Sequence, residues 1–148
     1  ATSLRNSGLQ IQSNVVHGKV PEPRVFISAE DALNQQIPDL ILLTVKAYDI
    51  ETVAGQIQTF APHPIPIRCF TNGVGSEATL STLLPQFAII PATTTTAVQM
   101  KENGVIQIER ERGIGLAGSH PLIPSIKRTF DASGMIVQMY RNPERMKW

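Results

Sequence analysis

The stretch from Asp39 to Asp49, DLILLTVKAYD, constrains the fold of this chain more than any other. Its apolar residues do not alternate with polar ones, and such a run predicts a strand buried on both faces, as in a parallel sheet. Asp49 is a suitable N-cap for a following helix, which makes the segment half of a βαβ unit. Ligands of open α/β sheets bind beyond the carboxyl ends of the strands, where Lys46 lies. The apolar residues of the expected helix are Ile50, Val53, Ala54, Ile57 and Phe60.

The composition is that of a globular protein. Of the 148 residues, 42% are hydrophobic and 17% are charged, and 13 Lys and Arg against 12 Asp and Glu leave a net charge of +1. This balance does not indicate a nucleic-acid or anionic-membrane partner, and no apolar segment is long enough to span a bilayer as a helix. The single cysteine, Cys69, cannot form an internal disulfide, so we expect a reducing, cytoplasmic setting. No residue pattern predicts a metal site.

A second strand is expected at Ile65–Phe70, and it leads into the polar loop Thr71–Glu77. Asn72 and Gly73 permit a tight turn with positive φ, and Ser76 can cap the helix that follows. A loop that opens onto a helix N-terminus is a place where anions and amide-bearing ligands bind. From the residues alone, the pair can equally be only a turn, because Asn-Gly is a frequent turn sequence.

Two further segments predict a hairpin. The β-branched run Thr93–Val98 favours a strand whose hydroxyl groups can line a polar site. Asn103 and Gly104 predict a turn into Val105–Ile108, which pairs the two segments. The expected fold class is therefore α/β, with a mainly parallel sheet and a β-hairpin.

Gly113, Gly115 and Gly118 match the G-x-G-x-x-G spacing of dinucleotide-binding sites. In such a site the helix begins within the motif, so that its N-terminus faces the pyrophosphate. Pro124 would then fall in the early turns of that helix, where it removes a hydrogen bond and clashes with the preceding turn, at a cost of about 3 kcal/mol. We therefore interpret these glycines as part of a β-hairpin and expect a later helix from about Pro124 to Ala132.

The last part of the chain predicts a strand and then a helix. Gly134 can end the preceding helix, and Met135–Tyr140 is an apolar, strand-like run. Asn142 as N-cap, Pro143 at the first helical position and Glu144 in the first turn predict a new helix.

In this order and at these separations, the segments resemble the ketopantoate reductase (2-dehydropantoate 2-reductase) family. The resemblance implies a Rossmann-type nucleotide-binding domain that is followed by a helical domain. It also implies the NADPH-dependent reduction of ketopantoate to pantoate, on the route to pantothenate and coenzyme A. The matching motifs, which span nearly the whole chain from Gly8, are Leu43–Asp49, Thr71–Gly75, Thr94–Ala97, Gly104–Gly118 and Met146–Trp148.

The resemblance assigns roles to three residues. Lys46 matches a lysine in the cofactor and substrate cleft, and Asn72 matches an asparagine that contacts the cofactor near the nicotinamide ribose. Ala97, together with Val98, matches a backbone segment that lines the nicotinamide pocket. Lys46 and Asn72 also suit the substrate, because positive charge and donated hydrogen bonds stabilise the alkoxide that hydride transfer to a ketone creates. From the residues alone, Lys46 can instead be an exposed strand end or the partner of Asp49 in an ion pair.

Parts of the family pattern have no match in this sequence. The opening strand, glycine-rich turn and helix that bind the pyrophosphate are missing. The proton-donating lysine of the family follows the tryptophan matched by Trp148, so the catalytic residue is not assigned, and Lys147 precedes that tryptophan and does not take this role. We therefore expect residues 1–148 to form a single, truncated Rossmann-type domain, without the C-terminal helical substrate domain and inactive by itself.

Two alternatives stay open. One is a non-enzymatic interaction domain that keeps the reductase scaffold, and the other is a paralogous reductase of a different 2-keto acid or another Rossmann-type oxidoreductase. For the enzyme, the expected partner is a small-molecule keto acid. Because missing strands would leave a sheet edge and apolar surface exposed, we also expect a homo-oligomer.

Overall fold

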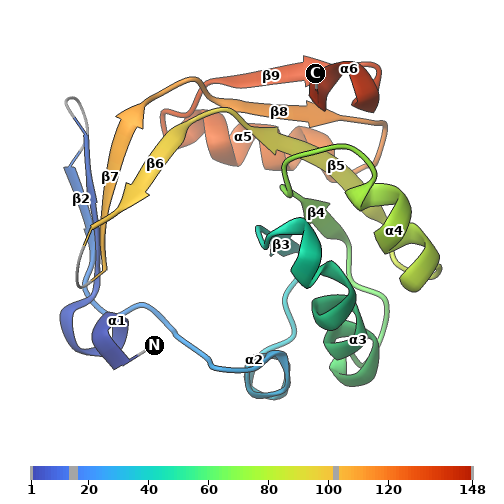
Figure 1. Ribbon diagram of the computed structural model, residues 1–148, viewed down its shortest axis with the longest axis horizontal. Coiled ribbons are helices and arrows are strands. Elements are labelled where there is room, and N and C mark those ends of the chain that lie inside the picture. Colours follow the sequence, from blue (N-terminus) through green and yellow to red (C-terminus); the bar gives the residue numbers. More distant parts are fainter. Residues whose placement is uncertain (1, 14–16, 102–103, 148) are drawn as a thin grey trace. The chain divides into compact units, whose positions relative to one another are not determined.

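The computed structural model describes residues 2–13, 17–101 and 104–147. The chain forms two compact units, one made of Ala1–Ser28 and Thr95–Arg112 and the other of Ala29–Thr94 and Gly113–Trp148. Each unit has its own sheet (Figure 1). The candidate residues Lys46 and Asn72 belong to the second unit, and Ala97 belongs to the first.

The first unit is a four-stranded sheet with the order β2-β1-β7-β6. Strand β1 is antiparallel to β2 and parallel to β7, and β6 is antiparallel to β7. The predicted hairpin is therefore confirmed, but the strand predicted over Thr93–Val98 is divided, because Thr93 and Thr94 end β5 (Ile89–Thr94) of the other sheet and β6 begins at Ala97. Gly104 has the expected positive φ of 81°, and Asn103 lies outside the described residues. The elements are α1 (Thr2–Ser7), β1 (Leu9–Gln12), β2 (His17–Val20), β6 (Ala97–Met100) and β7 (Val105–Arg110).

The second unit is a five-stranded mixed sheet with the order β3-β4-β5-β8-β9. Strands β3, β4 and β5 are parallel, β8 is antiparallel to β5, and β9 is parallel to β8. The predicted α/β class with a mainly parallel sheet is confirmed. The strands are β3 (Ile41–Leu43), β4 (Ile67–Cys69), β5 (Ile89–Thr94), β8 (Ile114–Ala117) and β9 (Val137–Tyr140). The helices are α2 (Ala29–Gln35), η1 (Ala47–Asp49), α3 (Ile50–Phe60), α4 (Ser76–Leu83), α5 (Ile123–Ala132) and α6 (Pro143–Lys147).

The two faces of this sheet carry separate apolar clusters. Ile67 and Cys69 of β4 pack with α3 and α4, whereas Ile90 and Ala92 of β5 pack with α5. Successive side chains of a strand point to opposite faces, so α3 and α4 cover one face and α5 covers the other (Figure 1). The predicted apolar positions Ile50, Ala54 and Ile57 are all buried in the first cluster, as the helical spacing required.

The predicted strand within Asp39–Asp49 is shorter and less buried than expected. It pairs in parallel with β4, but it comprises only Ile41–Leu43, and 49% of Leu42 is exposed. The prediction of burial on both faces is wrong because β3 is an edge strand whose second face is only partly covered. Asp49 occupies the N-cap position of α3 but makes no capping hydrogen bond through its side chain. At α4 the N-cap is Gly75, with φ of 98°, rather than Ser76.

Of the three spaced glycines, Gly115 lies in strand β8 and the other two flank it, and their interpretation as part of a β-hairpin is confirmed. The antiparallel β6–β7 pair continues as the antiparallel β5–β8 pair, with Gly115 opposite Thr93, and β8 also pairs with β9 in the second sheet. Helix α5 begins at Ile123, well beyond the motif, so the argument against a dinucleotide-binding turn is confirmed. A Cβ atom on Gly115 would lie 2.7 Å from Thr93 Cγ2 and 2.9 Å from Met146 Cγ. Close packing against β5 and α6 therefore explains this glycine.

The elements at the end of the chain are as predicted. Helix α5 spans Ile123–Ala132, Gly134 follows it with φ of 81°, and β9 spans Val137–Tyr140. The backbone N–H of Glu144 donates to Asn142 Oδ1 over 2.8 Å, which is the N-cap hydrogen bond expected at the start of α6.

Arg68 on strand β4 is an uncompensated charge within the second unit. Its side chain is 0% exposed, and its guanidinium nitrogens have no hydrogen-bond partner among the described residues. Burial lowers the pKa of Arg68 to about 10, so the group is charged at neutral pH. We expect Arg68→Leu to raise the free energy of unfolding by about 1–3 kcal/mol, because an apolar side chain fills the site without the cost of desolvating a charge.

Urea denaturation of the parent and Arg68→Leu chains measures this difference. The gain is expected at all pH values below about 10, where the guanidinium is charged in both the folded and the unfolded chain. A variant less stable than the parent would mean that the guanidinium is paired and contributes to folding.

Candidate functional site

The candidate site is built on the carboxyl ends of two neighbouring parallel strands. The backbone N–H of Phe70 donates to Leu43 O over 2.8 Å, which continues the β3–β4 ladder to the end of both strands. One step further, Thr71 Oγ1 donates to Val45 O over 3.0 Å. Val45 precedes Lys46 and Thr71 precedes Asn72, so this hydrogen bond holds the two candidate segments side by side.

Lys46 is an exposed residue with extended backbone, at φ −72° and ψ 155°. Its carbonyl oxygen accepts a hydrogen bond from the N–H of Asp49 over 3.0 Å, which closes the turn of η1. Among the described residues the Lys46 ammonium has no ion-pair partner, and Asp49 does not supply one. The alternative of a Lys46–Asp49 pair is therefore wrong, and the charge is available to a ligand.

Asn72 is exposed at the start of the β4–α4 loop. Thr93 Oγ1, from the next strand β5, donates to Asn72 Oδ1 over a long distance of 3.4 Å. With the amide oxygen engaged in this way, the NH₂ group is left to donate to a ligand. Gly73 follows with φ of 104°, so the predicted turn is present as well.

The loop after Asn72 leads into the N-terminus of α4. Because the N-cap is Gly75, no N-cap side chain accepts a hydrogen bond from the first-turn N–H groups. An uncapped helix N-terminus attracts anionic groups. The loop therefore adds hydrogen-bond donors beside the amide of Asn72.

Ala97 lies in the first unit, at the start of β6. It is exposed and pairs with Arg110, and the β6–β7 register shifts between Ala97 and Val98. Such a bulge interrupts the ladder and frees backbone groups for other contacts. The sequence did not predict the bulge, although it drew attention to the same two residues.

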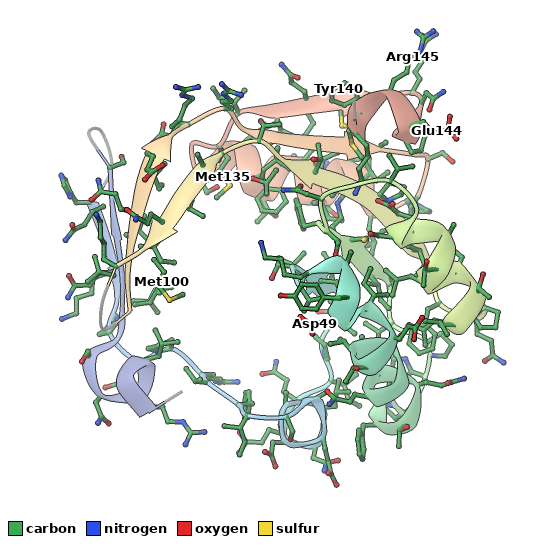
Figure 2. The ribbon with its side chains drawn as sticks, viewed as in Figure 1. Asp49, Met100, Met135, Tyr140, Glu144 and Arg145 are labelled. Atoms are coloured by element: carbon green, nitrogen blue, oxygen red, sulfur yellow. The ribbon has the colours of Figure 1, made fainter. Side chains whose placement is uncertain are left out.

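Sequence reasoning missed the side chain of Lys147. Only 4% of it is exposed, its Nζ donates to Thr71 O over 2.5 Å, and Glu77 Oε1 lies 2.8 Å from the same ammonium. By contrast, Glu144 and Arg145 of the same helix are exposed and point away from the sheet (Figure 2). No local pattern distinguishes Lys147 from other helix-end lysines, since its contacts lie about 70 residues earlier in the chain. Trp148 lies outside the described residues.

The described residues do not favour a cysteine nucleophile or a metal site. Cys69 is buried, and burial raises the pKa of its thiol, so it is a poor nucleophile. No group of three or more His, Cys, Asp or Glu side chains is placed to hold a metal ion among the described residues. None of the helices in the described ranges is long and apolar enough to cross a membrane.

The parallel β3–β4–β5 strands, their helices and the polar groups at their carboxyl ends define the class as a Rossmann-like α/β protein. A model of the family "Ketopantoate reductase PanE/ApbA" matches residues 1–118. The chain therefore belongs to the ketopantoate reductase family. A comparison with curated proteins found no match.

Solved structures share this fold at low sequence identity. The 2-dehydropantoate 2-reductase of Geobacter metallireducens GS-15 is 20% identical, with a TM-score of 0.84 over 97% of this chain and 48% of its own. The 2-dehydropantoate 2-reductase of Methylococcus capsulatus is 18% identical, with a TM-score of 0.84 over 99% of this chain and 48% of its own. A D-mandelate dehydrogenase with NADH and anilino(oxo)acetate is 20% identical, with a TM-score of 0.75 over 99% of this chain and 47% of its own. The chain thus spans about half the length of these structures.

Proposed function

We propose that the protein containing this chain is an NADPH-dependent oxidoreductase that reduces ketopantoate (2-dehydropantoate) to pantoate, a step toward pantothenate and coenzyme A. The observation that carries the proposal is the Thr71–Val45 hydrogen bond, because it places the segments of Lys46 and Asn72 together at the strand ends. Membership of the ketopantoate reductase family supports the same reaction.

The groups present fit a nicotinamide nucleotide and a keto acid. Lys46 offers an ammonium that has no ion-pair partner among the described residues, Asn72 offers an NH₂ donor, and the α4 N-terminus offers N–H groups to an anion. From the family resemblance, we also propose that the backbone of Ala97 and Val98 lines the nicotinamide pocket. The charges and donors of this set suit a negatively charged cofactor and the carboxylate of a 2-keto acid.

The bound cofactor supplies a hydride for the carbonyl carbon of the keto acid. As the carbonyl oxygen gains negative charge, the Lys46 ammonium and the Asn72 NH₂ group stabilise it by charge and hydrogen bonding. The proton that completes the new hydroxyl group comes from a donor outside the described residues, at the position that follows Trp148 in the family pattern.

The first experiment is a spectroscopic assay of ketopantoate-dependent NADPH oxidation by the full-length gene product. Turnover with ketopantoate supports the proposal. We further propose that the 148-residue chain alone is not catalytically competent, since it spans about half of the reductase structures that it matches. Measurable turnover by this chain would contradict that second proposal.

A second candidate function is the reduction of a different 2-keto acid. The match to a D-mandelate dehydrogenase with NADH and anilino(oxo)acetate supports this alternative and the use of NADH. Parallel assays with ketopantoate and phenyl-substituted 2-keto acids, each with NADPH and NADH, separate the two. A folded, full-length product that binds no nicotinamide nucleotide would favour the non-enzymatic interaction domain instead.

The chain is expected to self-associate. Strand β3 is a sheet edge, and Leu42 on it is 49% exposed, with Ile37 nearby in sequence 48% exposed. Exposed apolar edges pair with other chains, whereas a charge on the edge prevents this. Light scattering is expected to give a mass above that of the monomer, and Leu42→Lys is expected to shift it toward the monomer. A monomeric parent chain would contradict the prediction.

A further inference from the structure

A partly buried ion pair adjoins the candidate site. The Lys147 ammonium lies 2.8 Å from Glu77 Oε1, and the two side chains are 4% and 21% exposed. Glu77 belongs to the first turn of α4, directly after the loop that begins at Asn72. Lys147 belongs to α6, so the pair connects two helices that are far apart in sequence.

The same ammonium also fixes the backbone next to Asn72. Lys147 Nζ donates to Thr71 O over 2.5 Å. The Thr71 carbonyl and the Asn72 N–H belong to one planar peptide group, so a bond to this oxygen fixes the direction in which the chain enters Asn72. Thr71 Oγ1 is held in turn by Val45 O. Thr71 thus joins Lys147 to both candidate segments.

Packing alone does not explain a lysine at this position. A methionine side chain would fill nearly the same volume as the lysine side chain. The preceding residue of α6, Met146, is itself a buried methionine. The ammonium carries a desolvation cost that an apolar side chain avoids, and buried charges are often no more stabilising than apolar replacements. What the lysine adds is a directed hydrogen bond to one carbonyl oxygen and an ion pair with one carboxylate, whose Oε1 has no hydrogen-bond partner among the described residues.

We infer that Lys147 is a positioning residue that holds Asn72 in the orientation needed to contact the nicotinamide nucleotide. The inference rests on the proposed function for the role of Asn72. Lys147 acts through Thr71 and Glu77, and it does not itself contact the substrate. The position of α6 is thereby linked to the geometry of the β4–α4 loop.

A double-mutant cycle in the full-length gene product tests this. The dissociation constant of NADPH is measured by fluorescence for the parent, Lys147→Met, Asn72→Ala and the double variant. We expect Lys147→Met to weaken NADPH binding about 10-fold in the parent but less than about 3-fold in the Asn72→Ala background, because residues that act together are not additive. Lys127→Met is the matched control, since the one ion-pair partner of Lys127 among the described residues is Asp131 of the same helix, and both side chains are substantially exposed. Lys127→Met is expected to leave the dissociation constant of NADPH unchanged.

Hydrogen exchange of the peptide covering residues 71–77 gives a readout that does not depend on catalysis. Exchange there is expected to become faster in Lys147→Met than in Lys127→Met. The inference would be overturned if Lys147→Met weakened NADPH binding equally in the parent and in Asn72→Ala. It would also be overturned if Lys147→Met left the hydrogen exchange of residues 71–77 unchanged. If Lys147→Met does not fold, Glu77→Gln takes its place in the cycle, with a smaller expected effect of about 3-fold.

The cycle also separates this inference from the proposed function. A parent that binds NADPH but reduces no keto acid contradicts the proposed function alone, and the cycle still decides the role of Lys147. A parent that reduces ketopantoate but gives an additive cycle contradicts the role of Lys147 alone. A parent that binds neither NADPH nor NADH overturns both, whereas a parent that binds only NADH contradicts the proposed cofactor and the cycle is then measured with NADH.

Discussion

Lys46→Ala in the full-length gene product is expected to lower kcat/KM for NADPH-dependent ketopantoate reduction by about 100- to 1,000-fold. The loss of one preorganised group that stabilises a developing oxyanion has effects of this size. Lys46 is suited to that role because its ammonium is exposed and has no ion-pair partner among the described residues. Steady-state kinetics with varied ketopantoate and varied NADPH measure the change and show whether kcat or KM carries it.

Two further variants complete this experiment. Asn72→Ala is expected to lower kcat/KM for ketopantoate reduction strongly, because it removes the side-chain amide whose oxygen accepts a hydrogen bond from Thr93. Lys127→Ala removes an equally charged but exposed side chain from α5, and it is expected to stay within about 2-fold of the parent. If the parent turns over and neither Lys46→Ala nor Asn72→Ala reduces the rate, the family assignment stands and the proposed site is wrong.

The locally encoded parts of this structure were predictable from the sequence. The apolar positions of α3, the Asn142 cap of α6 and the positive φ of Gly73 each depend on residues within one or two turns of chain. Lys46 and Asn72 could be placed together for a related reason, because adjacent parallel strands end at the same edge of a sheet.

Features that depend on long-range pairing could not be predicted in the same way. The sequence of β8 does not say that it pairs with β9 as well as with β5, its partner in the hairpin. The exposure of Leu42 depends on β3 being an edge strand, and the burial of Lys147 depends on Thr71, 76 residues away. The division into two units also follows from contacts between segments far apart in sequence.

The spaced glycines show how the same residues can satisfy a functional pattern for a structural reason. Their spacing fits a phosphate-binding turn, but Gly113 and Gly118 have φ of 101° at the two ends of β8, and Gly115 lies where the strand meets its neighbours. Backbone conformation and close packing therefore account for all three, and neither requires a bound nucleotide.

Gly115→Val is accordingly expected to reduce the free energy of unfolding by about 3 kcal/mol, with no nucleotide present. Its Cβ would lie within 3.0 Å of Thr93 Cγ2 and Met146 Cγ, and overpacking of this kind typically costs 1–3 kcal/mol, here at the upper end because valine adds two further methyl groups. Urea denaturation followed by circular dichroism measures the loss. Gly55→Ala in α3 is the control, since nothing lies within 4 Å of its added Cβ, and the helix is expected to gain about 0.5–1 kcal/mol. A Gly115→Val chain as stable as the parent would mean that α6 does not pack on β8 in solution, and the contact of Lys147 with Thr71 would then lose its support.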